Sequence, residues 1–468
     1  MLRAMAWMGG MAVYKRYHIH TAEALPRVAP VGKFDIIRAD NCINCGTCIR
    51  SCVYGVHKRD EKDGRSMAEP LSHLCKNCFR CLMECPQRAI SMAPGKVYNS
   101  LGQGIWAPQR VFTIWNESQT GKIPVFGAGY RGRFSGPGYD GMWTDMSEIV
   151  RPTRDGIHGR EYISTGMNLG RRLRYLDFDA GGKLTSEVPK VVELPVPFMM
   201  DTTRITPLPD SLLNGYVSTA AHVGTLVLVS AERAAKLDPH YFSTVVPVLL
   251  KGAMDANIPA GTKLIEIHQA VGWQNLLNKI RTDRPEVLVA VRVKAMKDVE
   301  KDVLEIARAG ADAVHLDFGE DGKEDGAQGR YMRDALRSIH TNLVKNGMRD
   351  QISIIAGGGI AAAEHVPKSI ICGADCVVLE RALKVSLGCR ACADCRGSCP
   401  ADISHAPSDW VEKRVTNMVG AWRDQLLEVM GAMGIREVRR LRGEQGRAIF
   451  YEDAEKDAFA GIDGERSG

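Results

Sequence analysis

The sequence predicts an α/β protein built on a (β/α)8 TIM-type barrel, with a small α+β module on its N-terminal side. Two observations predict this fold. Short apolar runs alternate with helical stretches from residue 191 onward, a pattern typical of parallel βαβ units. Between residues 35 and 95, two cysteine motifs of identical spacing lie close together, which indicates a separate cysteine-rich module.

Seven apolar runs account for most of the predicted barrel. They lie at residues 191–200, 225–230, 263–267, 287–293, 313–318, 352–356 and 376–379. A helix is predicted over 299–309, because Val299, Val303 and Ile306 fall on one face. A closed barrel of this type has eight strands, and the apolar segment 245–249 is the candidate for the missing one.

Twelve of the fourteen cysteines fall into three runs with the spacing C-x2-C-x2-C-x3-C. The runs are Cys42, Cys45, Cys48 and Cys52; Cys75, Cys78, Cys81 and Cys85; and Cys389, Cys392, Cys395 and Cys399. Bacterial ferredoxins use this spacing to hold [4Fe–4S] clusters. Zinc sites do not call for a third closely spaced cysteine, and a disulfide framework would need an oxidising compartment. The spacing therefore predicts three [4Fe–4S] clusters, two of them in an N-terminal ferredoxin module.

The first two runs are expected to exchange their last ligands, because in two-cluster ferredoxins the fourth cysteine of each run binds the other cluster. The expected sites are Cys42, Cys45, Cys48 and Cys85, and Cys75, Cys78, Cys81 and Cys52. The third run has no partner run and is expected to close one cluster alone. Cys372 and Cys376 have apolar flanks and are interpreted as buried core thiols.

Composition divides the chain into six segments. Residues 1–34 are an extension, 35–95 the ferredoxin module, 96–190 a Gly- and Pro-rich connecting region, 191–388 the barrel, 389–400 the third cysteine motif, and 401–468 a C-terminal helix and tail. The connecting region contains G-x-G-x-x-G at 127–132. That motif binds dinucleotides only where a helix follows directly. The sequence RFSGPG follows here, so no nicotinamide site is expected.

Charge and hydropathy exclude several classes of protein. Lys and Arg total 61 against 55 Asp and Glu, and the net charge of +6 is too small to indicate nucleic-acid binding. No segment reaches the roughly 18 continuous apolar residues that span a bilayer. The run 4–14 has the length of a signal-peptide core, but Lys15 and Arg16 follow it before any cleavage-like site. We expect a cytoplasmic protein, where thiolates stay reduced.

The C-terminal part of the predicted barrel carries candidate phosphate ligands. The run 352–356 leads into Gly357, Gly358 and Gly359, and the run 376–379 leads into Glu380 and Arg381. In (β/α)8 barrels the loops after strands seven and eight commonly bind a phosphate. Glycines let backbone N–H groups approach the phosphate oxygens, and Arg381 would add positive charge. A plain turn between strand and helix is the alternative.

This region resembles the FMN-binding barrel of glutamate synthase. The likeness is carried by GGGI at 357–360, GADCVVLERAL at 373–383, GCRACADCRGSCP at 388–400 and MGIREVRRLRG at 433–443. In that family a cysteine motif follows the last barrel strand and holds an iron–sulfur centre against the flavin. The run 287–294 resembles the strand with a flavin-contacting lysine: Arg292 aligns with that lysine, and Lys294 lies on the same strand face. With its double ferredoxin, the chain resembles the archaeal-type, ferredoxin-fused glutamate synthases.

The resemblance implies noncovalent FMN, with its phosphate on Gly357, Gly358 and Gly359 and on the turn at Glu380 and Arg381. Arg292 or Lys294 would face the flavin ring. It also implies an oxidoreductase that passes electrons from ferredoxin-type clusters to FMN and then to an imine derived from a 2-oxo acid. The product would be glutamate, formed from 2-oxoglutarate. No catalytic residue is assigned.

Two kinds of partner follow from the resemblance. Ammonia would come from a glutamine amidotransferase subunit, because the chain has no amidotransferase domain. Electrons would come from a donor protein or an NAD(P)H-oxidising subunit. The chain departs from the family at 319–326, where an acidic loop replaces a glycine- and threonine-rich flavin loop. The alternative function is that of an electron-transfer subunit in a larger oxidoreductase complex, without a substrate site of its own.

Overall fold

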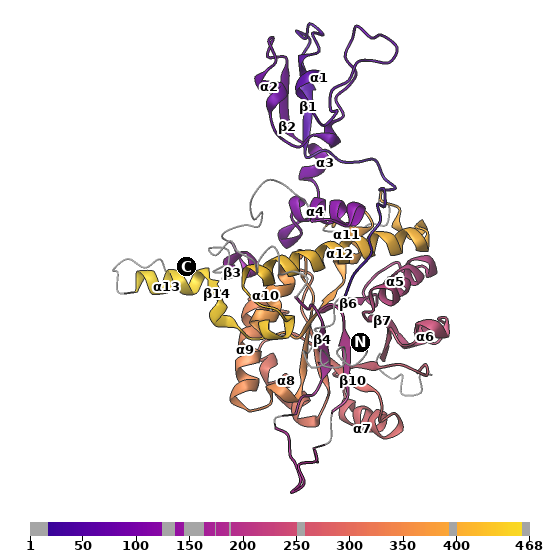
Figure 1. The fold of residues 1–468 in the computed structure, drawn as a ribbon, viewed down its shortest axis with the longest axis vertical. Coiled ribbons are helices and arrows are strands. Elements are labelled where there is room, and N and C mark those ends of the chain that lie inside the picture. The colour runs from indigo at the N-terminus through magenta and orange to yellow at the C-terminus, as the bar shows by residue number, and fades with distance from the viewer. Residues whose placement is uncertain are drawn as a thin grey trace, which may run out of the picture.

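The structure is a computed structural model that describes residues 17–123, 136–144, 163–173, 175–186, 189–249, 258–392 and 400–460. A small N-terminal module stands at one end of the molecule, and a barrel surrounded by helices forms the main body (Figure 1). The G-x-G-x-x-G motif at 127–132 lies outside the described residues, as do Cys395 and Cys399.

Eight parallel strands close into a barrel in sequence order, which confirms the predicted fold class. They are β6 (Phe198–Asp201), β7 (Val227–Ser230), β8 (Val245–Leu249), β9 (Leu264–His268), β10 (Leu288–Lys294), β11 (Ala313–Asp317), β12 (Ser353–Gly357) and β13 (Cys376–Leu379). The predicted eighth strand at 245–249 is confirmed as β8. Pairing of β13 with β6 closes the ring.

One of the predicted strands forms two separate strands in the structure. The run 191–200 divides into β5 (Val191–Leu194) and β6, and only β6 enters the barrel. Pro195 and Pro197 lie between them, and proline has no N–H to continue a strand ladder. β5 instead pairs antiparallel with β4 (Met167–Gly170) beside the barrel.

Helices follow most barrel strands and surround the ring (Figure 1). They are α5 (Asp210–Val223), α6 (Ala231–Ala234), α7 (Trp273–Asp283), α8 (Val299–Ala309), α9 (Met332–Lys345), α10 (His365–Cys372) and α11 (Arg381–Ser386). The helix predicted over 299–309 is confirmed with the same bounds as α8, and its apolar stripe is buried.

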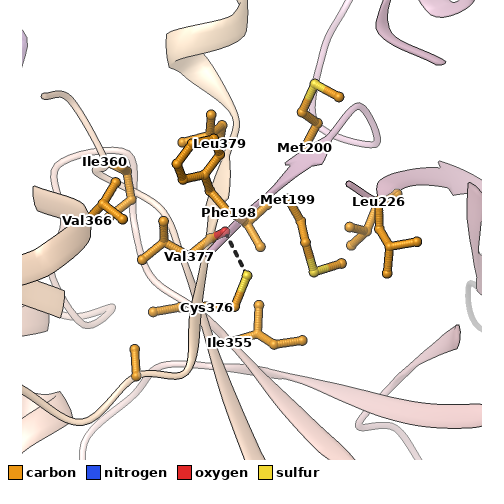
Figure 2. Close-up of a cluster of buried hydrophobic side chains, with 14 of the residues drawn as sticks. Phe198, Met199, Met200, Leu226, Ile355, Ile360, Val366, Cys376, Val377 and Leu379 are labelled. Carbon is orange, nitrogen blue, oxygen red and sulfur yellow. Dashed lines mark hydrogen bonds between the residues drawn. The ribbon is translucent and has the colours of Figure 1, made fainter. Parts of the chain in front are cut away.

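Apolar side chains fill the seam where β13 meets β6 (Figure 2). Phe198 and Met199 from β6 lie there beside Cys376 and Val377 from β13, all of them buried. The Cys376 thiol lies 3.4 Å from the carbonyl oxygen of Val377. Cys372 is also fully buried, and burial raises the pKa of its thiol to about 12. The interpretation of these two cysteines as core thiols is confirmed.

The N-terminal module has its own small core. Strands β1 (Phe34–Arg38) and β2 (Ile90–Pro94) pair antiparallel, and the short helices α1 (Thr47–Ser51) and α2 (Arg80–Met83) contact each other. Ile36, Val56, Cys81 and Ile90 are buried together. Helix α3 (Lys96–Asn99) then leads toward the barrel (Figure 1).

The connecting region contains a helix that the sequence did not predict. Helix α4 (Pro108–Thr120) begins with Pro108, whose missing N–H costs nothing at a helix start, and ends at Gly121 in a left-handed conformation (φ 66°). It packs against α12 (Ser408–Ala432). Strand β3 (Met142–Thr144) from the same region pairs with β14 (Ala448–Phe450), which precedes α13 (Tyr451–Phe459).

Arg414 of α12 joins three parts of the chain. Its guanidinium donates to the carbonyl oxygens of Ser386 in α11 (2.9 Å), Ala24 in the N-terminal segment (2.9 Å) and Trp115 in α4 (3.3 Å). Burial lowers its pKa to about 10, so it stays charged at neutral pH.

We predict that Arg414→Ala lowers the free energy of unfolding by about 3 kcal/mol or more, because three carbonyl groups lose their donor. Lys413→Ala is the matched control. Lys413 is exposed, its ammonium lies 3.8 Å from Asp409, and its loss should cost less than about 0.5 kcal/mol. Chemical denaturation followed by circular dichroism measures both. Equal losses in the two variants would contradict the role given to Arg414.

Candidate functional site

The structure brings four cysteines of the N-terminal module around one cavity. Cys52, Cys75, Cys78 and Cys81 line it together with apolar side chains such as Ile36. These are the four cysteines that the exchange of fourth ligands groups into one predicted site. In the other run, burial raises the pKa of the Cys48 thiol, and the nearby Cys42 adds to the shift. The thiols are free of disulfides and are therefore available to a metal cluster.

All three cysteine motifs share one local backbone geometry. The second residue after the first cysteine has a positive φ in each: Asn44 (55°), Asn77 (62°) and Ala391 (53°). This geometry turns the backbone N–H of Asn77 toward the sulfur of Cys75 (3.4 Å), and that of Ala391 toward Cys389 (3.5 Å). A positive φ at alanine is strained, and strain of this kind tends to persist at functional sites.

The third motif lies between the connecting region and the barrel. Gly102 donates its N–H to the carbonyl oxygen of Arg390 (2.8 Å), and the indole of Trp115 donates to that of Cys389 (3.3 Å). From the barrel side, Arg381 donates to the carbonyl oxygen of Cys392 (2.7 Å). The described half of the motif is therefore attached both to the segment that follows the N-terminal module and to the end of β13.

Buried charges meet inside the barrel at the carboxyl ends of its strands. Arg292 of β10 donates to Asp201 of β6 and to Glu266 of β9, each at 2.6 Å. Glu266 in turn contacts Nδ1 of His315 on β11 at 2.7 Å. All four side chains are almost fully buried. Burial alone would raise the pKa of Glu266, but the charge of Arg292 and the contact with His315 lower it to about 2.

A second group of charges lies beside the first. Arg204 pairs with Asp317 at the end of β11 and, at 3.4 Å, with Glu380 after β13. Burial raises the pKa of Glu380 to about 7, although Arg204 opposes the shift. Among the described residues, three buried polar atoms have no partner here: Nε2 of His315, Nε2 of His268 and Oε1 of Glu380. This end of a (β/α)8 barrel is where active sites form.

The predicted phosphate ligands are covered by the chain itself. A Cβ atom on Gly358 would lie 2.3 Å from the carbonyl oxygen of Phe318, and one on Gly359 would lie 2.3 Å from Cα of Gly322. The glycines thus allow the loop after β11 to pack on the turn after β12. Arg381 forms an ion pair with Glu320 of that same loop, so its charge is already balanced.

The two predicted ring-facing cations lie in different environments. Arg292 is 4% exposed and holds two carboxylates inside the barrel. Lys294 is largely exposed and pairs with Asp325 of the acidic loop at 2.5 Å. The structure therefore does not bring Lys294 into the buried cluster that contains Arg292.

Sequence reasoning missed most of the residues in the barrel mouth. They are Asp201, Arg204, Glu266, His268, His315 and Asp317. Several interrupt runs that are otherwise apolar, as in FMMD, LIEIH and AVHLD. Ionisable residues near the end of a buried parallel strand were the available signal, because such strands otherwise read as continuous hydrophobic runs.

Comparison with known proteins shows which proteins this chain resembles. Residues 252–436 match a family described as the conserved region in glutamate synthase. An archaeal-type glutamate synthase (NADPH) from Dehalococcoides mccartyi is 24% identical over 470 residues, covering 87% of this chain and 92% of that protein. An archaeal glutamate synthase (NADPH) from Archaeoglobus fulgidus is 24% identical over 502 residues, covering 91% of this chain and 96% of that protein. The chain is thus similar to archaeal-type glutamate synthases over most of its length.

This relationship confirms the predicted resemblance and extends it over most of the chain. A ferredoxin from Pyrobaculum islandicum is also similar, with 37% identity over 68 residues, covering 14% of this chain and 61% of that protein. Among the described residues, no helix is both long and apolar enough to cross a membrane.

The buried pairs of Arg292 give a stability prediction for the glutamate synthase-like barrel. Arg292→Leu should lower the free energy of unfolding by about 3–5 kcal/mol, because Asp201 and Glu266 are left buried without a cation. Lys294→Ala, on the same strand, removes an exposed pair and should cost less than about 1 kcal/mol. Denaturant titration of both variants tests this. A small loss in Arg292→Leu would show that the carboxylates do not depend on it.

Proposed function

We propose that the protein is an iron–sulfur flavoprotein oxidoreductase of the glutamate synthase type. The observation that carries this proposal is the position of the third cysteine motif, which contacts both the connecting region and Arg381 at the barrel mouth. In the proposal, electrons enter at the two clusters of the ferredoxin module, pass to a cluster in the third motif and reach the barrel mouth. The relatives' names support the same class of reaction.

FMN is the proposed acceptor at the mouth. A bound flavin would supply the conversion between one-electron and two-electron transfer. The buried polar atoms of His268, His315 and Glu380 that lack partners fit a ligand with a hydrogen-bonding edge, such as a flavin ring with its substrate. A phosphate at the glycine turn has a further requirement. The loop Phe318–Gly322 would have to move off Gly358 and Gly359.

We further propose that the product is glutamate, formed from 2-oxoglutarate and ammonia. This follows from the relatives, whose names state glutamate synthase activity with NADPH. Ammonia would come from an amidotransferase subunit, and electrons from a donor protein or an NAD(P)H-oxidising subunit. Arg204, which is about one-third exposed at the mouth, is the cation best placed to meet a substrate carboxylate.

A second candidate function is electron transfer inside a larger complex, without a substrate site in this chain. The covered glycine turn and the pair between Arg381 and Glu320 favour it, because both reduce what the turn offers a phosphate.

Cofactor content separates the two functions. Protein purified without oxygen should contain on the order of twelve irons, given three four-cysteine motifs. After reconstitution with excess FMN it should show flavin absorbance and should form glutamate from 2-oxoglutarate, ammonia and a chemical reductant. Iron without bound flavin or turnover would remove the enzyme proposal and leave the electron-transfer function. Stoichiometric zinc in place of iron would contradict both.

The third motif can be tested by itself. Cys392→Ser should remove about four irons and leave the two N-terminal clusters intact, because no other motif shares its ligands. Cys372→Ser is the matched control, since Cys372 is a fully buried core thiol outside the three motifs. Iron analysis and electron paramagnetic resonance measure the outcome. Unchanged iron in Cys392→Ser would show that Cys392 is not a cluster ligand.

A further inference from the structure

The barrel mouth contains a histidine whose tautomer is fixed by the fold. Glu266 contacts Nδ1 of His315 at 2.7 Å, and both side chains are buried. The pKa of Glu266 is held near 2 by Arg292 and His315 against the effect of burial, so Glu266 is ionised and can only accept a hydrogen bond. When the ring of His315 carries a single proton, the contact with Glu266 therefore places that proton on Nδ1 and leaves a lone pair on Nε2. Buried carboxylates orient catalytic histidines in this way.

Nε2 of His315 and Oε1 of Glu380 face the same small space. A Cβ atom on Gly357 would lie 2.5 Å from Nε2 of His315 and 3.1 Å from Oε1 of Glu380. Both atoms lack a partner among the described residues. Any side chain at position 357 would fill the space between them, which explains a glycine at the end of β12. This glycine serves the site in a way that does not involve phosphate.

Glu380 can hold a proton near neutral pH. Burial raises the pKa of its carboxyl to about 7; Arg204 and His315 oppose the shift, and Asp201 and Asp317 add to it. In the described part of the chain, these four residues are the charged or titratable neighbours that act on Glu380. The protonated carboxyl donates a hydrogen bond, whereas Nε2 of His315 accepts one. The two atoms thus offer one donor and one acceptor to the same ligand atom.

We propose that His315 and Glu380 recognise and protonate the nitrogen of a primary imine bound at the barrel mouth. A primary imine nitrogen carries one N–H, which can donate to His315, and one lone pair, which can accept from Glu380. A carbonyl oxygen has two lone pairs and no hydrogen, so it would leave Nε2 of His315 without a donor. The pair therefore favours an imine over the 2-oxo acid from which it forms. This inference rests on the proposed function and assigns its proton-transfer residues.

The O–H bond of Glu380 breaks, and an N–H bond forms on the imine, which becomes an iminium cation. The carboxylate left on Glu380 is next to Arg204, which stabilises its negative charge. The iminium carbon then takes a hydride from the two-electron donor of the proposed function and becomes the carbon of an amine. His315 keeps its Nδ1 proton throughout, and Glu266 acts as a positioning residue.

The first test needs no turnover. Nitrogen-15 NMR of the histidine rings in the intact wild-type chain should show His315 with its proton on Nδ1. Glu266→Gln should disturb this state, while His222→Gln, at an exposed histidine that contacts Glu412, should not. A carboxyl that titrates near pH 7 should be visible by infrared difference spectroscopy and should be missing in Glu380→Gln. If wild-type His315 carries its proton on Nε2 at neutral pH, the inference falls whatever the protein catalyses.

The second test uses turnover of 2-oxoglutarate with ammonia and a chemical reductant. Glu380→Gln keeps a hydrogen-bond donor but no transferable proton, and should lose about 10²–10⁴-fold in kcat. In the wild type, kcat should fall as pH rises through about 7, because Glu380 must be protonated; Glu380→Asp should retain part of the activity and this pH limb. Unchanged kcat and pH profile in a folded, iron-loaded Glu380→Gln variant would overturn the inference. No turnover by wild type would instead contradict the proposed function.

Discussion

The ion pairs of Arg292 with Asp201 and Glu266 are the interaction on which the upper part of the barrel depends. They join β6, β9 and β10 inside the ring, where an unpaired charge would be costly. The side chains that fill the seam below them are apolar (Figure 2). The polar atoms of the barrel interior are therefore concentrated at the carboxyl ends of the strands, where a ligand can reach them.

The ion pairs of Arg292 also determine the chemistry available at the barrel mouth. Because Arg292 keeps Glu266 ionised, Glu266 fixes the ring of His315 and turns Nε2 toward the space above Gly357. Glu380 has the opposite environment, and burial moves its pKa toward neutrality. The pKa values of these two carboxyl groups are thus shifted in opposite directions. In this way one site obtains both an ionised carboxylate that orients a histidine and a carboxyl that can donate a proton.

The connecting region links the two halves of the proposed electron path. It supplies Gly102 and Trp115, which hold the third cysteine motif, and Trp106, whose indole donates to the carbonyl oxygen of Glu320 at 3.0 Å. Glu320 also pairs with Arg381. The acidic loop after β11, the end of β13 and the third motif are consequently held together by polar contacts.

The sequence by itself determined the parts that depend on local pattern. Strand and helix periodicity was enough to predict the barrel, including β8, and cysteine spacing was enough to group Cys52 with Cys75, Cys78 and Cys81 around one cavity. Tertiary structure decided the contents of the mouth. Asp201, Glu266 and His315 come from three strands and Glu380 follows a fourth, so the four are spread over about 180 residues. Their roles arise only when barrel closure excludes water from around them and brings their charges together. The glycines of 357–359 show the same limit, because their spacing could not reveal that His315 and the loop after β11 pack against them.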